Sequence, residues 1–231
     1  MPNLVILTGA GISAESGIPT FRDANGLWEG HAVEAVASPE GFAQNPDLVH
    51  RFYNLRRAQL KNVAPNQAHL DLVRLEQKWR GGFLLVTQNV DDLHDRAGSK
   101  KLLHMHGELS KVRCEDCGIV ERWEGDVLVT SSCQKCSKVG RLRPHIVWFS
   151  EMPFHLDEIF LALEKADIFI SIGTSGQVYP AAGFVAHTSG SCRRIELNLK
   201  GTANSSSFSE HLVGSATDKV PLLVDQLLRG I

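Results

Sequence analysis

The chain has 231 residues, which suits one large domain or one domain that carries a smaller inserted one. Apolar residues make up 43% and charged residues 22%, so we expect a packed core, and the net charge of −2 gives no electrostatic case for nucleic-acid or membrane binding. No apolar run approaches the roughly 18 residues of a membrane span and no basic leader precedes residue 4, so we expect no signal peptide and a cytoplasmic protein.

Short apolar runs that end in small or polar residues alternate with helical patterns along the chain. The runs at 4–8, 81–89, 166–175 and 192–198 are typical of buried parallel strands, and helices are predicted over 47–61, 66–79 and 221–228. This alternation predicts an α/β fold. Ligands of open parallel sheets bind beyond the carboxyl ends of the strands. One crevice should therefore be lined by Thr8–Gly11, Thr87–Asn89, Gly173–Ser175 and Asn198.

The first strand runs into a glycine loop at 9–14, GAGISA, which fits the dinucleotide-binding pattern G-x-G-x-x-G/A. Gly9 and Gly11 would let the backbone approach a pyrophosphate. A dehydrogenase of this type also carries an acidic residue about 20 positions further on, at the end of a second strand. Glu29 and Glu34 lie in that region but end no apolar strand, which weakens the hydride-transfer interpretation.

The segment IPTFRD at 18–23 follows the glycine loop and allows two interpretations. It is either a solvated turn or a lid over the bound nucleotide. In a lid, Phe21 would shield a reactive carbon from water and Arg22 would hold the loop over phosphate.

Four of the five cysteines form two C-x-x-C pairs separated by fifteen residues: Cys114, Cys117, Cys133 and Cys136. Two such pairs can close a tetrahedral zinc site with no open position, which folds a small module but cannot activate water. The alternatives are a chance cluster or two redox dithiols. We predict one structural zinc ion per chain, held by an inserted module around 110–143. Cys192 stands apart and is interpreted as a buried small hydrophobe.

Two further polar clusters fall where the crevice is expected. Gln88, Asn89 and Asp91 follow the second strand, and His104 and His106 precede a glycine just ahead of the cysteine module. A single histidine is more often structural. Two near a junction between modules favour a general base, because imidazole titrates close to neutral pH.

In combination, these stretches resemble one family, the sirtuins, which are NAD-dependent protein lysine deacylases. The matches follow the family's order, cover nearly the whole chain and look bacterial or like a compact organellar member. They are GAGISAESGIPTFRD (9–23), TQNVDDLHDRAG (87–98), HMHG (104–107), the four-cysteine module, RPHIVWFSE (143–151), GTSGQVYPAA (173–182) and ELN (196–198).

The resemblance implies a fold of two domains with the ligands in the cleft between them. A Rossmann-like NAD-binding domain, a parallel sheet with helices on both faces, would comprise 1–28, 66–108 and 144–231. A small domain would combine a helical insertion (29–65) with a zinc ribbon module (109–143). NAD and an acylated lysine side chain of a protein substrate would meet between the two.

The resemblance also implies that NAD is consumed as a substrate rather than used for hydride transfer. Nicotinamide leaves, C1′ of its ribose develops oxocarbenium character, and the acyl oxygen of the lysine amide attacks that carbon. Asn89 and Asp91 would position the nicotinamide ribose and the departing ring. His106 would be the general base on a ribose hydroxyl, and His104 would be structural. The products would be free lysine, nicotinamide and O-acyl-ADP-ribose.

Further residues match binding positions of the family. The implied cofactor contacts are Gly9, Ala10, Gly11, Ser13, Ala14, Phe21, Arg22, Trp28, Gln88, Asn89, Val90, Asp91, Gly173, Thr174, Ser175, Asn198, Leu199, Lys200 and Ala216. Asn198 would bond ribose hydroxyls, and Ala216 would contact adenine. Ile146, Val147 and Phe149 match the segment that takes the peptide substrate by strand pairing. Ser150 replaces a glycine that is common at its position.

The predicted helix at 47–61 carries an arginine on its apolar face. At 100° per residue, one stripe contains Val49, Phe52, Tyr53 and Leu60, with Arg56 in its middle. The opposite face contains Arg51, Asn54 and Lys61. Arg56 could pair with a carboxylate elsewhere or lay its stem across apolar surface. Alternatively, Tyr53 and Arg56 point into the acyl-lysine tunnel, as in the sirtuin class that removes succinyl and malonyl groups, and Arg56 binds the distal carboxylate.

Two other functions remain open at the level of sequence. An NAD-consuming protein ADP-ribosyltransferase would use the same bound NAD with a different acceptor. A catalytically silent NAD-sensing or zinc-ribbon binding module would lack turnover, although intact Asn89, Asp91 and His106 argue against it.

Overall fold

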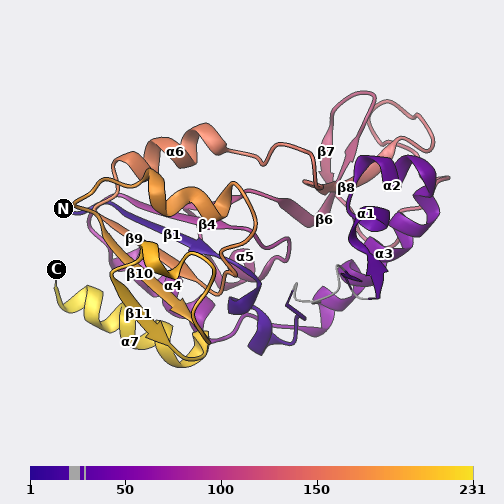
Figure 1. Cartoon of the computed structure of the whole chain (residues 1–231). Helices are drawn as coiled ribbons and strands as arrows, with labels where there is room; N and C mark the ends of the chain where they lie inside the picture. The colour runs from indigo at the N-terminus through magenta and orange to yellow at the C-terminus, as the bar shows by residue number, and fades with distance from the viewer. Residues whose placement is uncertain (21–26, 29, 231) are drawn as a thin grey trace.

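The computed structural model describes residues 1–20, 27–28 and 30–230. It shows a large α/β part and a smaller part that is formed by two separate segments of the chain (Figure 1). Both chain ends lie at the end of the large part that faces away from the smaller one. The expected cofactor contacts Phe21 and Arg22 fall outside the described residues.

The large part is built on a parallel six-stranded sheet with the order β11-β10-β9-β1-β4-β5. The strands are β1 (Leu4–Thr8), β4 (Phe83–Thr87), β5 (Leu102–His104), β9 (Ile168–Ile172), β10 (Arg193–Asn198) and β11 (Glu210–Val213). The predicted Rossmann-like α/β class is confirmed. The second predicted strand, 81–89, is observed as Phe83–Thr87, and Gln88 and Asn89, which follow it, line the crevice.

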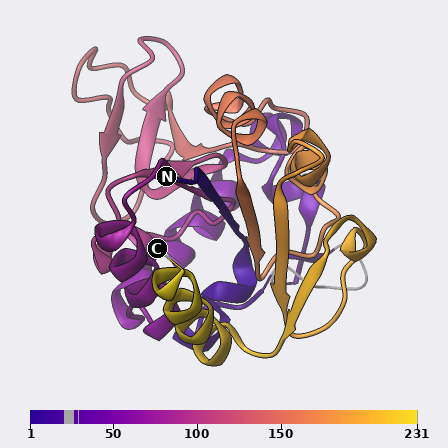
Figure 2. The same cartoon turned by 90° about the vertical axis from the view of Figure 1, so that its left-hand side faces the viewer.

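Helices cover both faces of this sheet (Figures 1 and 2). One face packs against α4 (Gln67–Lys78) and α7 (Ala216–Arg229), and the other against α6 (Leu156–Glu164) and the 3-10 helix η4 (Ala181–His187). Successive strand residues point to opposite faces. In β1, Leu4 and Ile6 therefore enter the first core, whereas Val5 and Leu7 enter the second.

The last helix starts earlier than the sequence indicated. We expected it over 221–228, but α7 begins at Ala216 and contains Pro221. The Ser215 side chain caps its start by accepting a hydrogen bond from the backbone N–H of Asp218. The Glu15 carboxylate accepts two further bonds from the N–H and hydroxyl of Thr217. The cap by Ser215 is local in the sequence, whereas the bonds to Glu15 require the tertiary structure.

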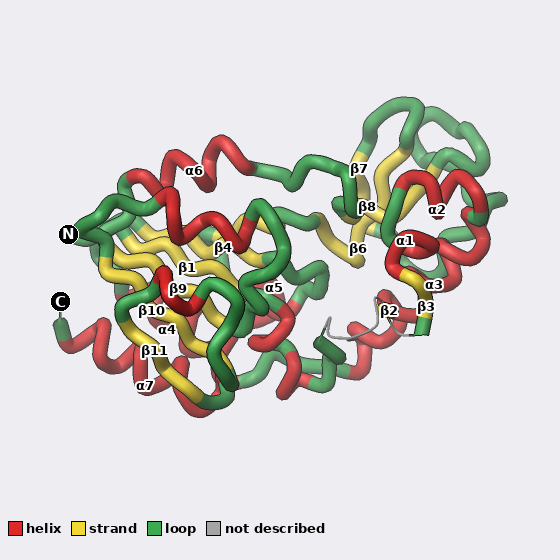
Figure 3. Tube along the Cα trace, viewed as in Figure 1, coloured by secondary structure: helices red, strands yellow, loops and turns green. Residues whose placement is uncertain are grey.

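The smaller part joins a three-stranded antiparallel sheet to a helical insertion (Figure 3). The sheet, of order β7-β6-β8, consists of β6 (Gly107–Cys114), β7 (Val120–Arg122) and β8 (Leu142–Ile146). The insertion contains β2 (Leu27–Trp28), β3 (His31–Ala32), α1 (Val33–Val36), α2 (Pro39–Gln44), α3 (Pro46–Gln59) and the 3-10 helix η3 (Leu60–Asn62). Leu109 and Ile146 of the sheet pack with Phe52 and Tyr53 of α3 in one core.

Three short elements lie on the cleft side of the large part. The 3-10 helices η1 (Ala10–Ile12) and η2 (Ala14–Ser16) follow β1, and α5 (Leu93–Ala97) follows β4. A further 3-10 helix, η5 (Ser205–Ser207), precedes β11.

Within the described ranges, none of the helices combines the length and apolar character that a membrane span requires.

Helix α3 is buried on two sides, which corrects one expectation. The predicted apolar stripe is buried, but Asn54, expected on the solvent side, is buried as well. Its side chain exchanges two 2.9 Å hydrogen bonds with the backbone of Val127, and the neighbouring Arg57 donates from Nε to the carbonyl of Leu109 at 2.8 Å. The periodicity of a single helix cannot reveal a second neighbour that covers its polar side.

Candidate active site

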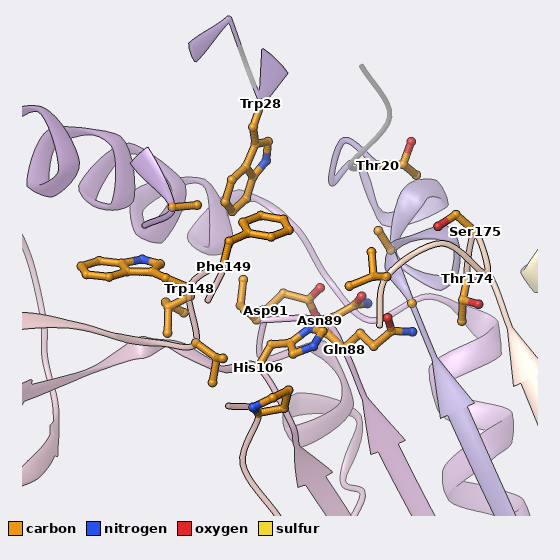
Figure 4. Close-up of a pocket in the computed structure, with 18 of the residues that line it drawn as sticks. Thr20, Trp28, Gln88, Asn89, Asp91, His106, Trp148, Phe149, Thr174 and Ser175 are labelled. Atoms are coloured by element: carbon orange, nitrogen blue, oxygen red, sulfur yellow. The ribbon is translucent and has the colours of Figure 1, made fainter. Parts of the chain in front are cut away.

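A cleft of about 300 Å³ lies beyond the carboxyl ends of β1, β4 and β9 (Figure 4). Residues from all three strand ends line it: Gly9–Gly11, Gln88–Asp91 and Gly173–Ser175. The smaller part contributes Tyr53, Trp28 and the segment 146–149. The structure therefore brings together segments that the sequence placed at one crevice independently of each other.

The glycines of the first loop allow close packing between two loops. Backbone hydrogen bonds join Gly9 to Ile172 at 3.0 Å and Gly11 to Gly173 at 2.8 Å. A Cβ atom on Gly11 would lie 2.6 Å from the Cα atom of Gly173, which itself has a φ of 65°. Any side chain here would push the two loops apart, so these glycines shape one wall of the cleft.

A buried serine holds the two polar residues at the cleft floor. Ser13 Oγ donates to Asp91 Oδ2 at 3.0 Å and accepts from Asn89 Nδ2 at 3.1 Å. Asp91 also accepts from the backbone N–H of Leu93, and burial raises the pKa of this carboxyl. Ser13, predicted to contact the cofactor, lies beneath the lining and orients Asn89 and Asp91, which do line the cleft.

His106 presents one ring nitrogen to the cleft. Its Nδ1 atom lies 3.0 Å from the backbone carbonyl oxygen of Gln88, and a carbonyl can only accept, so Nδ1 carries the hydrogen. The neutral ring therefore has an unprotonated Nε2. Burial lowers the pKa of His106. The following Gly107 has a φ of 84°, and a Cβ there would lie 2.1 Å from the carbonyl oxygen of His145.

His104 differs from His106 in its surroundings. Its Nε2 atom lies 2.9 Å from Asp95 Oδ2, and it is not among the described residues that line the cleft. Burial lowers its pKa, but the carboxylate of Asp95 outweighs burial and the net shift is upward. The pair is suited to holding α5 against β5, in line with the structural role expected for His104.

The segment predicted to take a peptide lines the cleft with Ile146, Val147 and Phe149. The N–H of Val147 donates to the carbonyl of His106 at 2.9 Å, and that of Phe149 donates to Ala37 at 3.0 Å. These two N–H groups are therefore already paired within the chain. Ser150 has a φ of 72°, a conformation that explains why glycine suits this position.

The structure separates the two residues of the predicted acyl-selectivity pair. Tyr53 lines the cleft, and its hydroxyl accepts a 3.0 Å hydrogen bond from Trp148 Nε1. Arg56 is not among the described lining residues. Its guanidinium carbon lies 3.3 Å from the centroid of the Phe52 ring, and Nη1 donates to the carbonyl of Phe52. These contacts hold Arg56 against its own helix, in an adjacent hollow that also contains His31.

Several predicted adenosine-side contacts do not line the cleft in the described part of the chain. Asn198 is buried behind it, where its side chain donates to the carbonyl of Thr174 and accepts from the N–H of Leu199. It therefore supports the loop at 173–175 from behind. The contacts predicted for Ala14, Leu199, Lys200 and Ala216 stay predictions.

Some lining residues were not singled out from the sequence. These are Ile18, Pro19, Thr20, Ala37, Trp148, Glu151, Pro153, Val178 and Tyr179. Most of them lie inside stretches that carried the family resemblance. The sequence therefore indicated the stretch but not the role of the individual residue.

The four module cysteines converge as a tetrahedral site requires. Their Sγ atoms all lie within 4.8 Å of one another, with 3.7 Å between Cys114 and Cys136 and 3.6 Å between Cys117 and Cys133. Zinc–sulfur bonds of about 2.3 Å in a tetrahedron place sulfur atoms roughly 3.8 Å apart. The donors therefore fit one structural zinc ion. Cys192 is buried elsewhere, as expected.

Comparisons with known proteins agree with this geometry. The model of the Sir2 family matches residues 9–180. A Bdellovibrio bacteriovorus protein named NAD-dependent protein deacylase is 61% identical over 228 residues, covering 98% of this chain and 97% of the relative. A Rhodopirellula baltica protein of the same name is 56% identical, covering 96% and 98%. A solved structure described as a Sir2 homologue in complex with NAD superposes with a TM-score of 0.88 at 39% identity, covering 99% and 90%.

Proposed function

The chain belongs to the Sir2 family, and we propose that it is an NAD-dependent protein lysine deacylase that removes acetyl groups and also succinyl or malonyl groups. One observation carries the proposal. The unprotonated Nε2 of His106, the Asn89 and Asp91 side chains and the peptide-binding segment all face a single cleft. Such a cleft can hold a nucleotide on one side and an acylated lysine on the other.

The residues at the cleft suit the steps that deacylation requires. Asn89 and Asp91, oriented by Ser13, would bind the ribose and the departing nicotinamide. After the acyl oxygen has attacked C1′, Nε2 of His106 would take the proton of a ribose hydroxyl, which then attacks the acyl carbon. The C–N bond to that carbon then breaks and releases the free lysine amine, which takes up a proton. Water would add to the acyl carbon that remains on the ribose, so that the acyl group leaves as an ester of ADP-ribose. The acceptor class follows from the same cleft: acylated lysine side chains of proteins.

The acyl preference rests on Tyr53 and Arg56. Tyr53 already lines the cleft, and the Arg56 guanidinium lies 5.1 Å from the ring of Trp28, which lines it too. The arginine head group therefore lies next to the cleft wall. Rotation about its side-chain bonds would let it exchange the carbonyl of Phe52 for a carboxylate at the end of an acyl tail.

Paired kinetics on one peptide test the acyl preference. The peptide carries either acetyl-lysine or succinyl-lysine. For succinyl-lysine, Arg56→Met should lower kcat/KM by an amount that corresponds to about 2–4 kcal/mol of activation free energy. For acetyl-lysine, the loss of kcat/KM should be much smaller. Arg51→Met, an exposed arginine on the same helix, is the matched control. Equal losses on both substrates would make Arg56 a structural residue.

The same incubation separates the reaction classes. With NAD and an acylated peptide, a deacylase yields free lysine peptide and O-acyl-ADP-ribose. A protein ADP-ribosyltransferase would instead add mass to a protein acceptor, and a silent NAD-sensing module would produce neither.

We also propose that the protein works in the cytoplasm. Four thiols poised as metal ligands are suited to a reducing compartment. Fractionation of cells that express a tagged chain tests this, and recovery outside the cytoplasm would contradict it.

A further inference from the structure

The hydrogen bond between Trp148 and Tyr53 has an unambiguous direction. The indole N–H can only donate, so the Tyr53 hydroxyl is the acceptor across the 3.0 Å between Nε1 and Oη. The hydroxyl retains one hydrogen of its own. Among the described residues, no acceptor for that hydrogen is present, and Tyr53 lines the cleft. The phenol is therefore set as a donor.

Contacts of both its backbone and its ring hold Trp148 in this position. Its backbone N–H donates to Glu151 Oε2 at 2.8 Å, and the Arg143 guanidinium carbon lies 3.3 Å from its ring centroid. Arg143 and Arg113 both bond the Glu151 carboxylate. The Trp148 side chain is only 2% exposed. Figure 4 shows the indole at the cleft wall, beside Phe149.

We infer that Trp148 is a specificity-determining residue that acts through Tyr53, by presenting the phenol to the acyl tail as a hydrogen-bond donor only. A tail that ends in a carboxylate, which only accepts, satisfies this donor. An apolar tail of the same size would bury the hydroxyl hydrogen without a partner, which is unfavourable. An acetyl group ends in a methyl and carries no tail that could accept from the hydroxyl. The inference rests on the proposed function, since it names what distinguishes the acyl groups of that reaction.

The neighbouring charges support the same preference. Burial raises the pKa of Tyr53 and so opposes negative charge at this wall, but Arg143 and Arg56 both favour it, and Glu151, which opposes them, is bonded to two arginines. A tail carboxylate would therefore meet a donor hydroxyl and two arginine charges that offset part of the cost of its burial.

A double-mutant cycle tests the inference with three acyl groups on one peptide: acetyl, succinyl and 4-methylpentanoyl, in which an isopropyl group replaces the carboxylate. Trp148→Phe and Tyr53→Phe should each lower the succinyl-to-acetyl ratio of kcat/KM roughly tenfold. The double variant should lose no more than Tyr53→Phe alone, because both changes remove one interaction. Both single variants should raise the ratio of kcat/KM for the 4-methylpentanoyl peptide to kcat/KM for the succinyl peptide.

Phe42→Leu is the packing control. The Phe42 ring lies 5.3 Å from the Trp148 ring but carries no hydrogen-bonding group, so the variant should not change the ratio between acyl groups. A ratio that falls as much in Phe42→Leu as in Trp148→Phe would overturn the inference in favour of general packing.

A spectroscopic measurement does not depend on the folding of Trp148→Phe. Labelling with 15N-tryptophan gives signals from four indoles. Tyr53→Phe should move one of them strongly upfield, and in the wild type a succinylated peptide should shift that same signal more than an acetylated one. If the losses in the double-mutant cycle are additive, or if Tyr53→Phe leaves all indole signals unchanged, the inference about Trp148 is overturned but the proposed function is not. A wild type without desuccinylation overturns the proposed acyl preference as well.

Discussion

The Nδ1 atom of His106 lies 3.0 Å from the backbone carbonyl oxygen of Gln88. Because that oxygen cannot donate, the contact selects the tautomer with the hydrogen on Nδ1 and leaves Nε2 free to accept a proton. Gln88 directly follows β4, and His106 directly precedes β6. The bond therefore links the floor of the NAD side to the start of the smaller part, and it orients the base.

Replacement of His106 should abolish deacylation without unfolding the protein. His106→Ala removes the only proton acceptor that the described part of the cleft offers as an imidazole, so we expect kcat to fall by 10²-fold or more. Circular dichroism and zinc content should match those of the wild type. Near-normal turnover in such a folded variant would refute the assignment.

The pH dependence should follow the lowered pKa of His106. The neutral ring is the active form, and burial lowers its pKa below the usual 6.5, while the bond to Gln88 partly offsets this. The ring thus stays neutral to lower pH than free histidine. The acid limb of kcat/KM should fall below pH 6.5 as the ring becomes protonated. An acid limb centred above pH 6.5 would contradict a lowered pKa of His106.

Loss of any zinc ligand should destabilise the smaller part. Cys117→Ala leaves three thiols around a site whose binding energy is folding energy, so activity should fall indirectly and the variant should retain little zinc. Cys192→Ala is the control, because that thiol lies outside the cluster. Metal analysis should find about one zinc per active chain. Far less zinc in a fully active wild type would exclude a structural metal.

Arg57 should contribute more to stability than its neighbours on α3. It donates to the carbonyl of Leu109 and to Asn54 Oδ1, both at 2.8 Å, and it is buried. Arg57→Met removes both bonds and leaves the carbonyl of Leu109 without this donor, which should lower the free energy of unfolding by about 1–3 kcal/mol. Arg51→Met, on an exposed position, should change it by less than about 0.5 kcal/mol. Urea unfolding measures the free energy of unfolding of both variants. Equal losses in Arg57→Met and Arg51→Met would contradict a role of Arg57 in joining α3 to the zinc module.

Ser150 should tolerate glycine better than any branched residue. Its φ of 72° disfavours side chains, so Ser150→Gly relieves strain and, after the entropy that glycine adds to the unfolded chain, should change stability by about 0 to +1 kcal/mol. Ser150→Val should be clearly destabilising. If thermal unfolding shows glycine to be the worse of the two, the turn at 148–151 does not require this backbone conformation.

Much of the site could be predicted because its signals are local. The C-x-x-C spacing brings two thiols to one point within each turn, whatever surrounds them. Likewise, each polar residue that follows an apolar strand must emerge at the carboxyl edge of a parallel sheet, which is why Gly9, Asn89 and Gly173 meet there. The order of motifs then implied the family and the base, His106.

Other features were decided only by the tertiary structure, because they depend on which distant segment covers a given side chain. Periodicity placed Tyr53 and Arg56 on one face of α3, but the packing of Trp148 and Phe52 determined that only the tyrosine lines the cleft. Asn54 looked solvent-exposed until the backbone of Val127 paired with it. Direction and burial of a polar side chain are set by its partner, and a partner far along the chain leaves no local trace in the sequence.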